Sequence, residues 1–148
     1  KKLPFAKHSI VNRSAMRKNA KEKMQQYQVR ASGKSGVDTQ VRLLSGGNQQ
    51  KLIIARELTD SAKLIIASQP TRGLDIGATE FVRQQLINQR NAGKAVMLIS
   101  ADLEEIMALS DRIAVLFGGK IVGVLSREEA TVQKIGLLMG GISEEEEK

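Results

Sequence analysis

A glycine-rich turn that runs directly into an apolar-periodic stretch constrains this chain more than any other feature. Residues 44–51 read LSGGNQQK, and residues 52–58 read LIIAREL. Ser45 is a natural N-cap, and Gly46 and Gly47 leave the first turn without side-chain bulk, so we expect a helix from Gly46 to about Thr59. The start of such a helix presents backbone N–H groups and a positive dipole end to an anion, most often phosphate. An ordinary capped surface helix is the alternative.

Three further motifs follow this octapeptide in order. Residues 69–75 read QPTRGLD, residues 98–106 read LISADLEEI, and residues 110–115 read SDRIAV. Together with the octapeptide, they resemble ATP-binding cassette (ABC) ATPases, and most closely the double-cassette ATPases of bacterial sugar and nucleoside importers. The resemblance covers the last two thirds of the chain well and the first third loosely. Several ordered motifs with family-like spacing are a far stronger signal than any one alone.

The pattern of apolar residues predicts alternating helices and strands after an irregular lead-in at 1–12. A loop is expected at 29–41, and strand, helix, strand at 63–67, 76–91 and 95–99 indicate a βαβ unit with buried, parallel strands. A hairpin is expected at 112–125, where a Gly-Gly pair separates two apolar runs, and SREE at 126–129 is a capping box for the last helix. Further helices are expected at 13–28 and 102–109.

The resemblance implies an α/β fold, namely a partial P-loop NTPase (ABC ATPase) cassette. This fragment would contain a parallel sheet with flanking helices, a C-terminal hairpin and helix, and part of the helical subdomain. Residues 1–62 would form part of the helical, signature-bearing subdomain with a basic N-terminal region. Residues 63–148 would form the C-terminal part of the RecA-like core with an acidic tail at 144–147.

Composition narrows the class of protein further. With 148 residues, 41% of them hydrophobic and 26% charged, the chain fits one soluble globular domain. No apolar run approaches the length of a membrane span, the N-terminus is not a signal peptide, and the absence of cysteine excludes disulfides and thiolate metal sites. His8 is the only histidine, and no metal constellation surrounds it.

Positive charge is concentrated early in the chain, whose net charge is +7. A nucleic-acid contact would use such charge, but few aromatic residues are available to stack on bases. A solvated basic face, or a patch near anionic lipid or a membrane partner, fits the composition better. Glu22 is the one acidic residue in the first 30 positions. The basic residues there are Lys1, Lys2, Lys7, Arg13, Arg17, Lys18, Lys21, Lys23 and Arg30.

The segment Gly33-Lys34-Ser35 imitates the end of a phosphate-binding loop. The full pattern needs a glycine five residues before Gly33, where this chain has Gln28, and no apolar strand precedes it. We therefore reject it. In ABC ATPases the phosphate loop and the glutamine loop lie upstream of the signature, so we expect the chain to be the C-terminal piece of a cassette.

The resemblance also implies a role for the glycine-rich turn. ABC ATPases bind two ATP molecules between two cassettes, and the signature of one cassette covers the ATP held by the other. Asn48 stands where many members have glutamine, and it keeps the amide. Asp75 matches the aspartate of the D-loop, which crosses the cassette interface, and it also suits the N-cap of the helix that follows. The residues expected to contact the ATP phosphates in trans are Ser45, Gly46, Gly47, Asn48 and Gln49.

Three positions depart from the family pattern. Ser68 and Gln69 stand where the family has an aspartate for Mg²⁺ and a glutamate that activates the attacking water, and Ala101 stands where a histidine touches the γ-phosphate. A neutral hydroxyl is a poor Mg²⁺ ligand, an amide cannot accept a proton, and a methyl group cannot form a hydrogen bond. We therefore expect no intact catalytic or metal-binding residue at these degenerate positions. A misaligned strand end is the alternative.

The resemblance implies an importer ATPase that couples ATP binding and hydrolysis, with Mg²⁺, to the uptake of nucleosides or simple sugars. Expected partners are the first cassette of the same polypeptide or a partner cassette, transmembrane permease subunits and, indirectly, a substrate-binding protein. The expected location is cytoplasmic, on the inner face of the cell membrane. The isolated chain is expected to be inactive, and apolar faces left without the missing strands would promote self-association. Alternatives are a non-transport ABC ATPase acting on nucleic acid and a non-catalytic regulatory cassette.

Overall fold

The computed structural model describes residues 5–7, 10–31, 36–58 and 61–142. Contacts divide the chain into two compact units. The first unit comprises residues 1–65 and 70–95, and the second comprises residues 66–69 and 96–148. The predicted subdomain boundary between residues 62 and 63 concerns the family's subdomains and stays a prediction.

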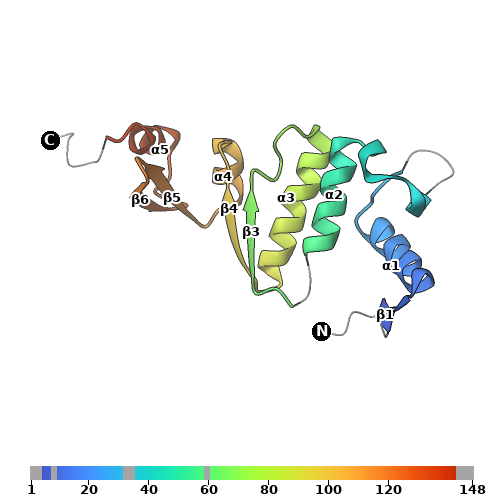
Figure 1. Cartoon of the computed structure of the whole chain (residues 1–148). Coiled ribbons are helices and arrows are strands. Elements are labelled where there is room, and N and C mark those ends of the chain that lie inside the picture. The colour runs from blue at the N-terminus through green and yellow to red at the C-terminus, as the bar shows by residue number, and fades with distance from the viewer. Residues whose placement is uncertain (1–4, 8–9, 32–35, 59–60, 143–148) are drawn as a thin grey trace. The chain divides into compact units, whose positions relative to one another are not determined.

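The first unit is mainly helical (Figure 1). The predicted helices at 13–28, 46–59 and 76–91 are confirmed within two residues, but the irregular lead-in predicted at 1–12 is wrong at residues 6–7 and 10–11. Two short antiparallel strands form there, with Ala6 opposite Val11 and Lys7 opposite Ile10. The elements are β1 (Ala6–Lys7), β2 (Ile10–Val11), α1 (Arg13–Gln26), the 3₁₀ turns η1 (Gly36–Asp38) and η2 (Val41–Leu43), α2 (Gly46–Glu57) and α3 (Ile76–Asn91).

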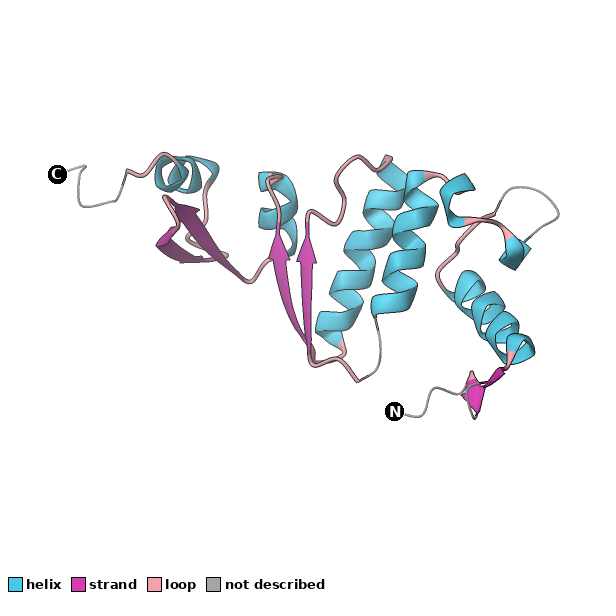
Figure 2. Cartoon of the chain, viewed as in Figure 1, coloured by secondary structure: helices cyan, strands magenta, loops and turns pink. Residues whose placement is uncertain are grey.

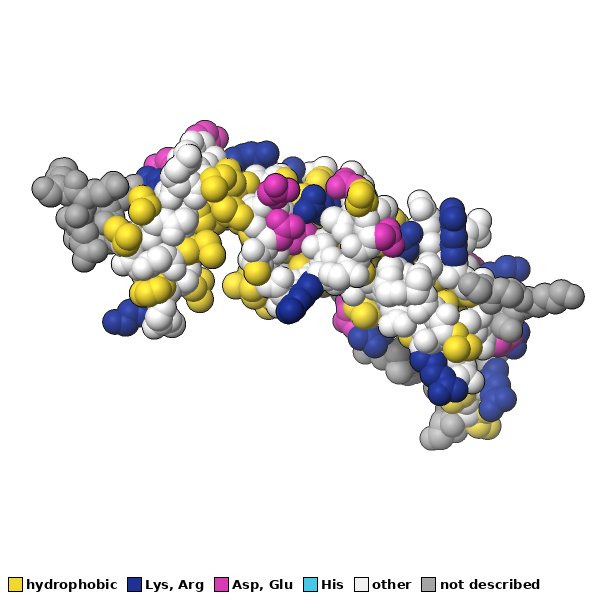
Figure 3. All heavy atoms as spheres, turned by 90° about the horizontal axis from the view of Figure 1, so that it is seen from above, with side chains coloured by type: hydrophobic (Ala, Val, Ile, Leu, Met, Phe, Trp, Pro, Cys, Tyr) yellow, Lys and Arg dark blue, Asp and Glu magenta, His cyan; other side chains and the backbone are white. Residues whose placement is uncertain are grey.

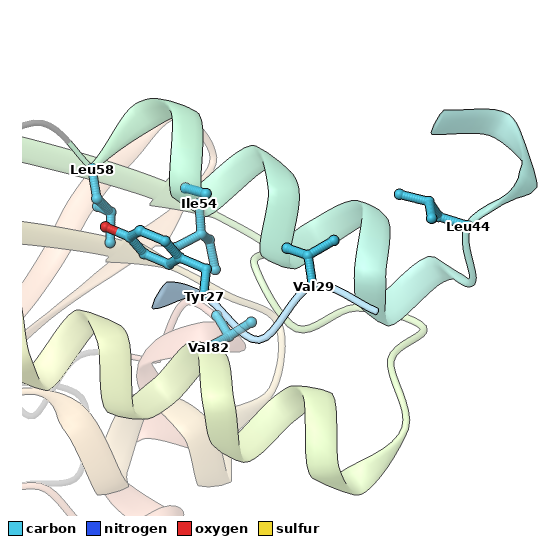
Figure 4. Packing of buried hydrophobic residues seen from close by; sticks show 7 residues of the cluster. Tyr27, Val29, Leu44, Ile54, Leu58 and Val82 are labelled. Carbon is cyan, nitrogen blue, oxygen red and sulfur yellow. The ribbon is translucent and has the colours of Figure 1, made fainter. Parts of the chain in front are cut away.

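The core of the first unit lies where α2 and α3 meet the chain around Tyr27 and Val29 and at Leu44 (Figure 4). Val82 of α3 is completely buried, and its neighbours on the same helix face, Ala78 and Leu86, are nearly so. Residues four apart share a helix face, which explains why the apolar spacing of α3 buries one stripe. The other buried members of the cluster are Tyr27, Val29, Leu44, Ile54, Ala55 and Leu58.

Strands β3 (Leu64–Ser68) and β4 (Ala95–Ile99) pair with each other and run parallel (Figure 2). The predicted strands and their order around α3 are confirmed, but their predicted burial is wrong. Alternate side chains are exposed, for example Leu64 by 55%, Ile66 by 62% and Met97 by 52%. A sheet of two strands leaves apolar side chains uncovered, because the described residues supply no layer over that face. The expectation of exposed apolar faces is therefore confirmed.

The second unit contains the predicted hairpin. α4 (Leu103–Leu109) precedes β5 (Arg112–Phe117) and β6 (Lys120–Ser126), which pair antiparallel. Gly118 and Gly119 make the turn, both with positive φ, as a two-residue hairpin of this kind requires. α5 (Val132–Met139) follows and packs on the hairpin. The buried apolar residues of this unit are Ile113, Val115, Leu125, Ala130, Ile135 and Leu138.

The capping box at 126–129 does not start the last helix. Its two reciprocal hydrogen bonds form, from the Ser126 N–H to Glu129 Oε2 at 2.9 Å and from the Glu129 N–H to Ser126 Oγ at 3.4 Å. The chain then becomes extended at Thr131, whose hydroxyl accepts the N–H of Lys134 at 3.1 Å and caps α5. The box closes an isolated turn, and the helix begins six residues after Ser126.

Several features of the sequence analysis lie outside the described residues. These are Lys1 and Lys2, His8, the segment Gly33-Lys34-Ser35, Thr59 at the predicted end of the signature helix, and the acidic run at 144–147. Among the described residues, none of the helices combines the length and apolar character needed to cross a bilayer.

Candidate functional site

The N-terminus of α2 lacks the side-chain cap that its N-cap residue could supply. Ser45 occupies the N-cap position as predicted, but its hydroxyl caps no backbone N–H and instead accepts a hydrogen bond from Asn48 Nδ2 at 2.9 Å. Every other α-helix in the described part of the chain begins with a side-chain cap, supplied by Asn12, Asp75, Asp102 and Thr131. The first-turn N–H groups of α2 therefore receive no acceptor from the N-cap side chain, which suits an external anion.

The two glycines of the turn have different surroundings. Gly46 is exposed, and a Cβ placed on it would meet nothing within 4 Å. Gly47 is buried, and a Cβ there would lie 2.9 Å from Ala78 Cβ and 3.3 Å from Asp75 Oδ2. Gly47 thus allows α2 to approach the first turn of α3, whereas Gly46 keeps the helix start open to solvent.

The side-chain amides of Asn48 and Gln49 form hydrogen bonds with residues that precede α2. Asn48 Oδ1 accepts the N–H of Arg30 at 2.7 Å while its Nδ2 donates to Ser45. Gln49 Nε2 donates to the carbonyl of Leu44 at 2.9 Å. Both side chains therefore have structural partners, and their contact with phosphate stays a prediction.

Asp75 and Gln50 connect the turn to the segment after β3. Asp75 Oδ1 accepts the N–H of Ala78 at 2.8 Å, so the predicted N-cap role is confirmed, and Oδ2 faces Gly47. Gln50 Nε2 donates to the carbonyl of buried Pro70 at 2.9 Å. Sequence reasoning assigned Gln50 no role, although its position three residues after Gly47 places it on the same side of α2.

The degenerate positions come together in the second unit. Ser68 is exposed at the end of β3, and Gln69 has a positive φ of 49°. The Gln69 N–H donates to the carbonyl of Ile99 at 2.7 Å, and its Oε1 accepts the N–H of Ala101 at 3.4 Å. Both the backbone and the side chain of Gln69 therefore form hydrogen bonds with residues at and just after the end of β4. None of the three positions supplies a carboxylate or an imidazole.

The acidic cluster after β4 serves the start of α4. Asp102 Oδ1 accepts the N–H of Glu105 at 3.2 Å, which agrees with its interpretation as a helix-start cluster. Glu105 itself is completely buried, which the sequence did not indicate. Within the ranges that the structure describes, no three His, Cys, Asp or Glu side chains lie close enough to hold a metal ion.

Solved ABC ATPase cassettes resemble this chain in fold. Residues covering 82% of this chain superpose on 51% of the ATP-binding cassette MJ0796, solved as a dimer bound to ADP and Pi, with a TM-score of 0.64 and 26% identity. No protein-family model matches the chain. The chain therefore has the fold of part of an ABC ATPase cassette, and both the predicted fold class and the resemblance are confirmed.

The homologues of the chain are ATP-binding proteins of nucleoside and sugar importers. It is 50% identical to the guanosine import ATP-binding protein NupO of Bacillus subtilis over 145 residues, which are 98% of this chain and 28% of NupO. It is 37% identical to the ribose import ATP-binding protein RbsA of Lacticaseibacillus paracasei over 141 residues, which are 95% of this chain and 28% of RbsA. The chain thus spans little more than a quarter of these relatives.

Proposed function

We propose that this chain is the C-terminal part of the second cassette of an importer ATPase, which couples ATP binding and hydrolysis to the uptake of nucleosides or simple sugars. The names of its relatives support this proposal, and the higher identity to NupO than to RbsA favours nucleosides. The ATPase would act in the cytoplasm on the inner face of the membrane. It would work with a first cassette and permease subunits and, through the permease, with a substrate-binding protein.

Within that ATPase, the chain would supply its signature to the ATP held by the partner cassette. The observation that carries this proposal is the start of α2, where the hydroxyl of Ser45 is engaged by Asn48 and caps no N–H. Gly46 leaves this helix start exposed, so backbone N–H groups can approach the phosphates without a side chain between them. Fixed N–H donors and a helix dipole stabilise negative charge well because they need little reorganisation.

Asp75 would contribute to the same function as the D-loop aspartate. Its Oδ1 is occupied by the Ala78 N–H, and its Oδ2 lies beside the position of Gly47. The carboxylate therefore positions the start of α3 against the signature turn. A role in crossing the interface between cassettes would use the exposed part of the same residue.

The chain's own catalytic positions would be inert. Ser68 and Gln69 offer a hydroxyl and an amide, a donor set that does not fit the carboxylate preference of Mg²⁺. Gln69 also has no basic group to accept a proton from water, and Ala101 has no polar side chain. A general base contributes roughly 10²–10⁴-fold to rate, so its absence would leave this site nearly silent. Mg²⁺ would be held by other residues of the whole protein.

A regulatory cassette without turnover is the second candidate, and the same missing carboxylate and imidazole favour it. The two candidates predict different ATPase activities of the whole protein but the same inert catalytic positions in this chain. Measurable ATP hydrolysis by the whole protein supports the importer ATPase, whereas nucleotide binding without hydrolysis supports the regulatory cassette.

Nucleotide binding and hydrolysis by the isolated chain test the assignment of the signature in trans. With Mg²⁺ present and the salt concentration controlled, we expect neither binding nor turnover, while a complete cassette with its own phosphate loop serves as the positive control. Turnover that responds to substitution of Ser68 or Gln69 would show that these positions belong to a working site, which would overturn the proposal.

A further inference from the structure

The exposed side of α1 carries an excess of positive charge. The helix contains five Lys or Arg side chains and one acid, Glu22, and none of its residues is buried. Arg13, Arg17 and Lys21 recur every four residues, so they share one face, and Lys18 lies beside them. We call these four residues the basic α1 face. Figure 3 shows Lys and Arg side chains gathered over the N-terminal part of the chain.

The C-terminal end of α1 contacts the core, and the four residues of the basic α1 face precede that end. Met24 packs against the buried cluster of the first unit, and Tyr27, just after the helix, is only 5% exposed. Lys23, near the same end of the helix, has its Nζ 5.3 Å from the centre of the Tyr27 ring. All four residues of the basic α1 face are exposed, although Met24, near the end of the helix, shares the stripe of Arg13 and Arg17.

Within the described residues, most of this charge has no carboxylate beside it. Arg17 forms an ion pair with Asp38 of η1, with 2.5 Å between Nη2 and Oδ2. No carboxylate of the described residues lies within ion-pair distance of Arg13, Lys18 or Lys21. A partner with several negative charges would therefore meet an attractive surface.

Exposed apolar side chains immediately precede α1 in the chain. Ile10 and Val11 of β2 immediately precede the Asn12 cap of α1, and they are 74% and 54% exposed. The carbonyl of Phe5 accepts the N–H of Asn12 at 2.7 Å, which closes the β1–β2 hairpin against the helix start. Basic side chains beside exposed aliphatic ones match the two components of a membrane surface, anionic headgroups and acyl chains.

We propose that the basic α1 face, together with Ile10 and Val11, docks directly onto a surface of anionic phospholipid. This contact would be additional to any contact with permease subunits. A lipid surface fits better than nucleic acid, because α1 contains no aromatic residue and Tyr27 is buried, so nothing on this face can stack on bases. Exposed aliphatic residues contribute little to phosphate-backbone contacts but are stabilised at the edge of the acyl region.

Sedimentation with vesicles tests the proposal on the full chain. We expect binding to phosphatidylcholine vesicles that contain phosphatidylglycerol, weaker binding as salt rises, and little binding to pure phosphatidylcholine. The double variant Lys18→Glu/Lys21→Glu should bind at least about tenfold more weakly. Ile10→Ser/Val11→Ser should reduce the part of the binding that resists salt. The milder Lys18→Gln/Lys21→Gln keeps the test valid if charge reversal disturbs folding, which circular dichroism reports.

The matched control is Lys120→Glu/Arg127→Glu, which makes the same change in net charge at two exposed positions of the second unit. We expect this control to keep most of the anionic-vesicle binding. Equal loss in both double variants would show a general charge effect and overturn the proposal. Equal binding to neutral vesicles would also overturn it, as would preferential binding of duplex DNA over anionic vesicles. Capture by an acidic peptide in preference to the vesicles would contradict it in the same way.

Discussion

The side-chain amide of Gln50 donates a hydrogen bond of 2.9 Å to the backbone carbonyl of Pro70. This bond joins α2, one turn into the helix, to the segment that leads from β3 to α3. Gly47 allows a second contact between the same two segments, because its missing side chain leaves room for Ala78 and Asp75. The proposed signature turn and the proposed D-loop are therefore held together as one piece of structure.

Replacing Gln50 by alanine should destabilise the chain by about 1 kcal/mol. The substitution removes the donor to a carbonyl whose residue is buried, and a hydrogen bond of this kind contributes about that much. Denaturant unfolding gives the free energy directly. The matched control is Gln84→Ala, whose amide donates to Asn88 at 2.9 Å on an exposed helix face and whose loss should cost about 0.5 kcal/mol or less. Equal costs at the two positions would contradict the account.

The two signature glycines should respond differently to alanine. Gly47→Ala places a Cβ 2.9 Å from that of Ala78, so α2 and α3 must move apart, at a cost of about 1–3 kcal/mol. Gly46→Ala meets no atom within 4 Å and should change the free energy of unfolding by less than about 1 kcal/mol. Urea unfolding of the two variants gives the comparison, and a larger cost at Gly46 would refute the packing described for this turn.

The isolated chain should self-associate through the uncovered side of β3 and β4. Leu64, Ile66 and Met97 are each more than half exposed there, and apolar surface of this kind is an association site. Sedimentation velocity should show concentration-dependent association that Ile66→Thr/Met97→Thr reduces. Ile76→Thr is the control, because Ile76 is 85% exposed and lies on α3 rather than on the sheet. A strictly monomeric wild-type chain would contradict this prediction.

Acid titration should detect the isolated turn before α5. Hydrogen bonding to the backbone N–H of Ser126, which donates to the carboxylate at 2.9 Å, and then to the Ser126 side chain holds the pKa of Glu129 below its ordinary value of 4.5. Because the pKa is lower in the folded state, the stabilisation is present above the unfolded pKa and is lost as pH falls through the folded pKa. NMR titration of Ser126→Ala should show a higher pKa for Glu129, still below 4.5 because the backbone donor remains. An unchanged pKa would exclude a role for the hydroxyl.

The long elements were predictable because their signals are local and repeated. α3 shows apolar residues at helical spacing with Asp75 as its cap, and the β5–β6 hairpin shows two apolar runs around a glycine pair. The β1–β2 pair could not be found in the same way, since strands of two residues have no measurable periodicity. The capping box at Ser126 gave a wrong start for the last helix, because its local hydrogen bonds form whether or not a helix follows.

The residues of the candidate site were proposed from the sequence, but the contacts that the structure gives them could not be predicted from it. Motif order identified Ser45, Gly46 and Gly47, yet the hydroxyl of Ser45 is engaged by Asn48 instead of capping α2. The bond from Gln50 to Pro70 spans 20 residues and depends on how α2 packs, so no local pattern encodes it. The exposure of β3 and β4 likewise depends on which other segments are present to cover the sheet.

ATP hydrolysis by the complete importer ATPase, compared between Gly46→Asp and Gln69→Ala, tests the central claim most directly. Gly46→Asp places a negative side chain at the exposed start of α2, where the proposed phosphate contact lies, and should abolish turnover. Gln69→Ala removes only a 3.4 Å bond from the Ala101 N–H at a site already without a base, so turnover should change little. Similar losses of activity in the two variants would contradict a chain that donates its signature while its own catalytic positions are inert.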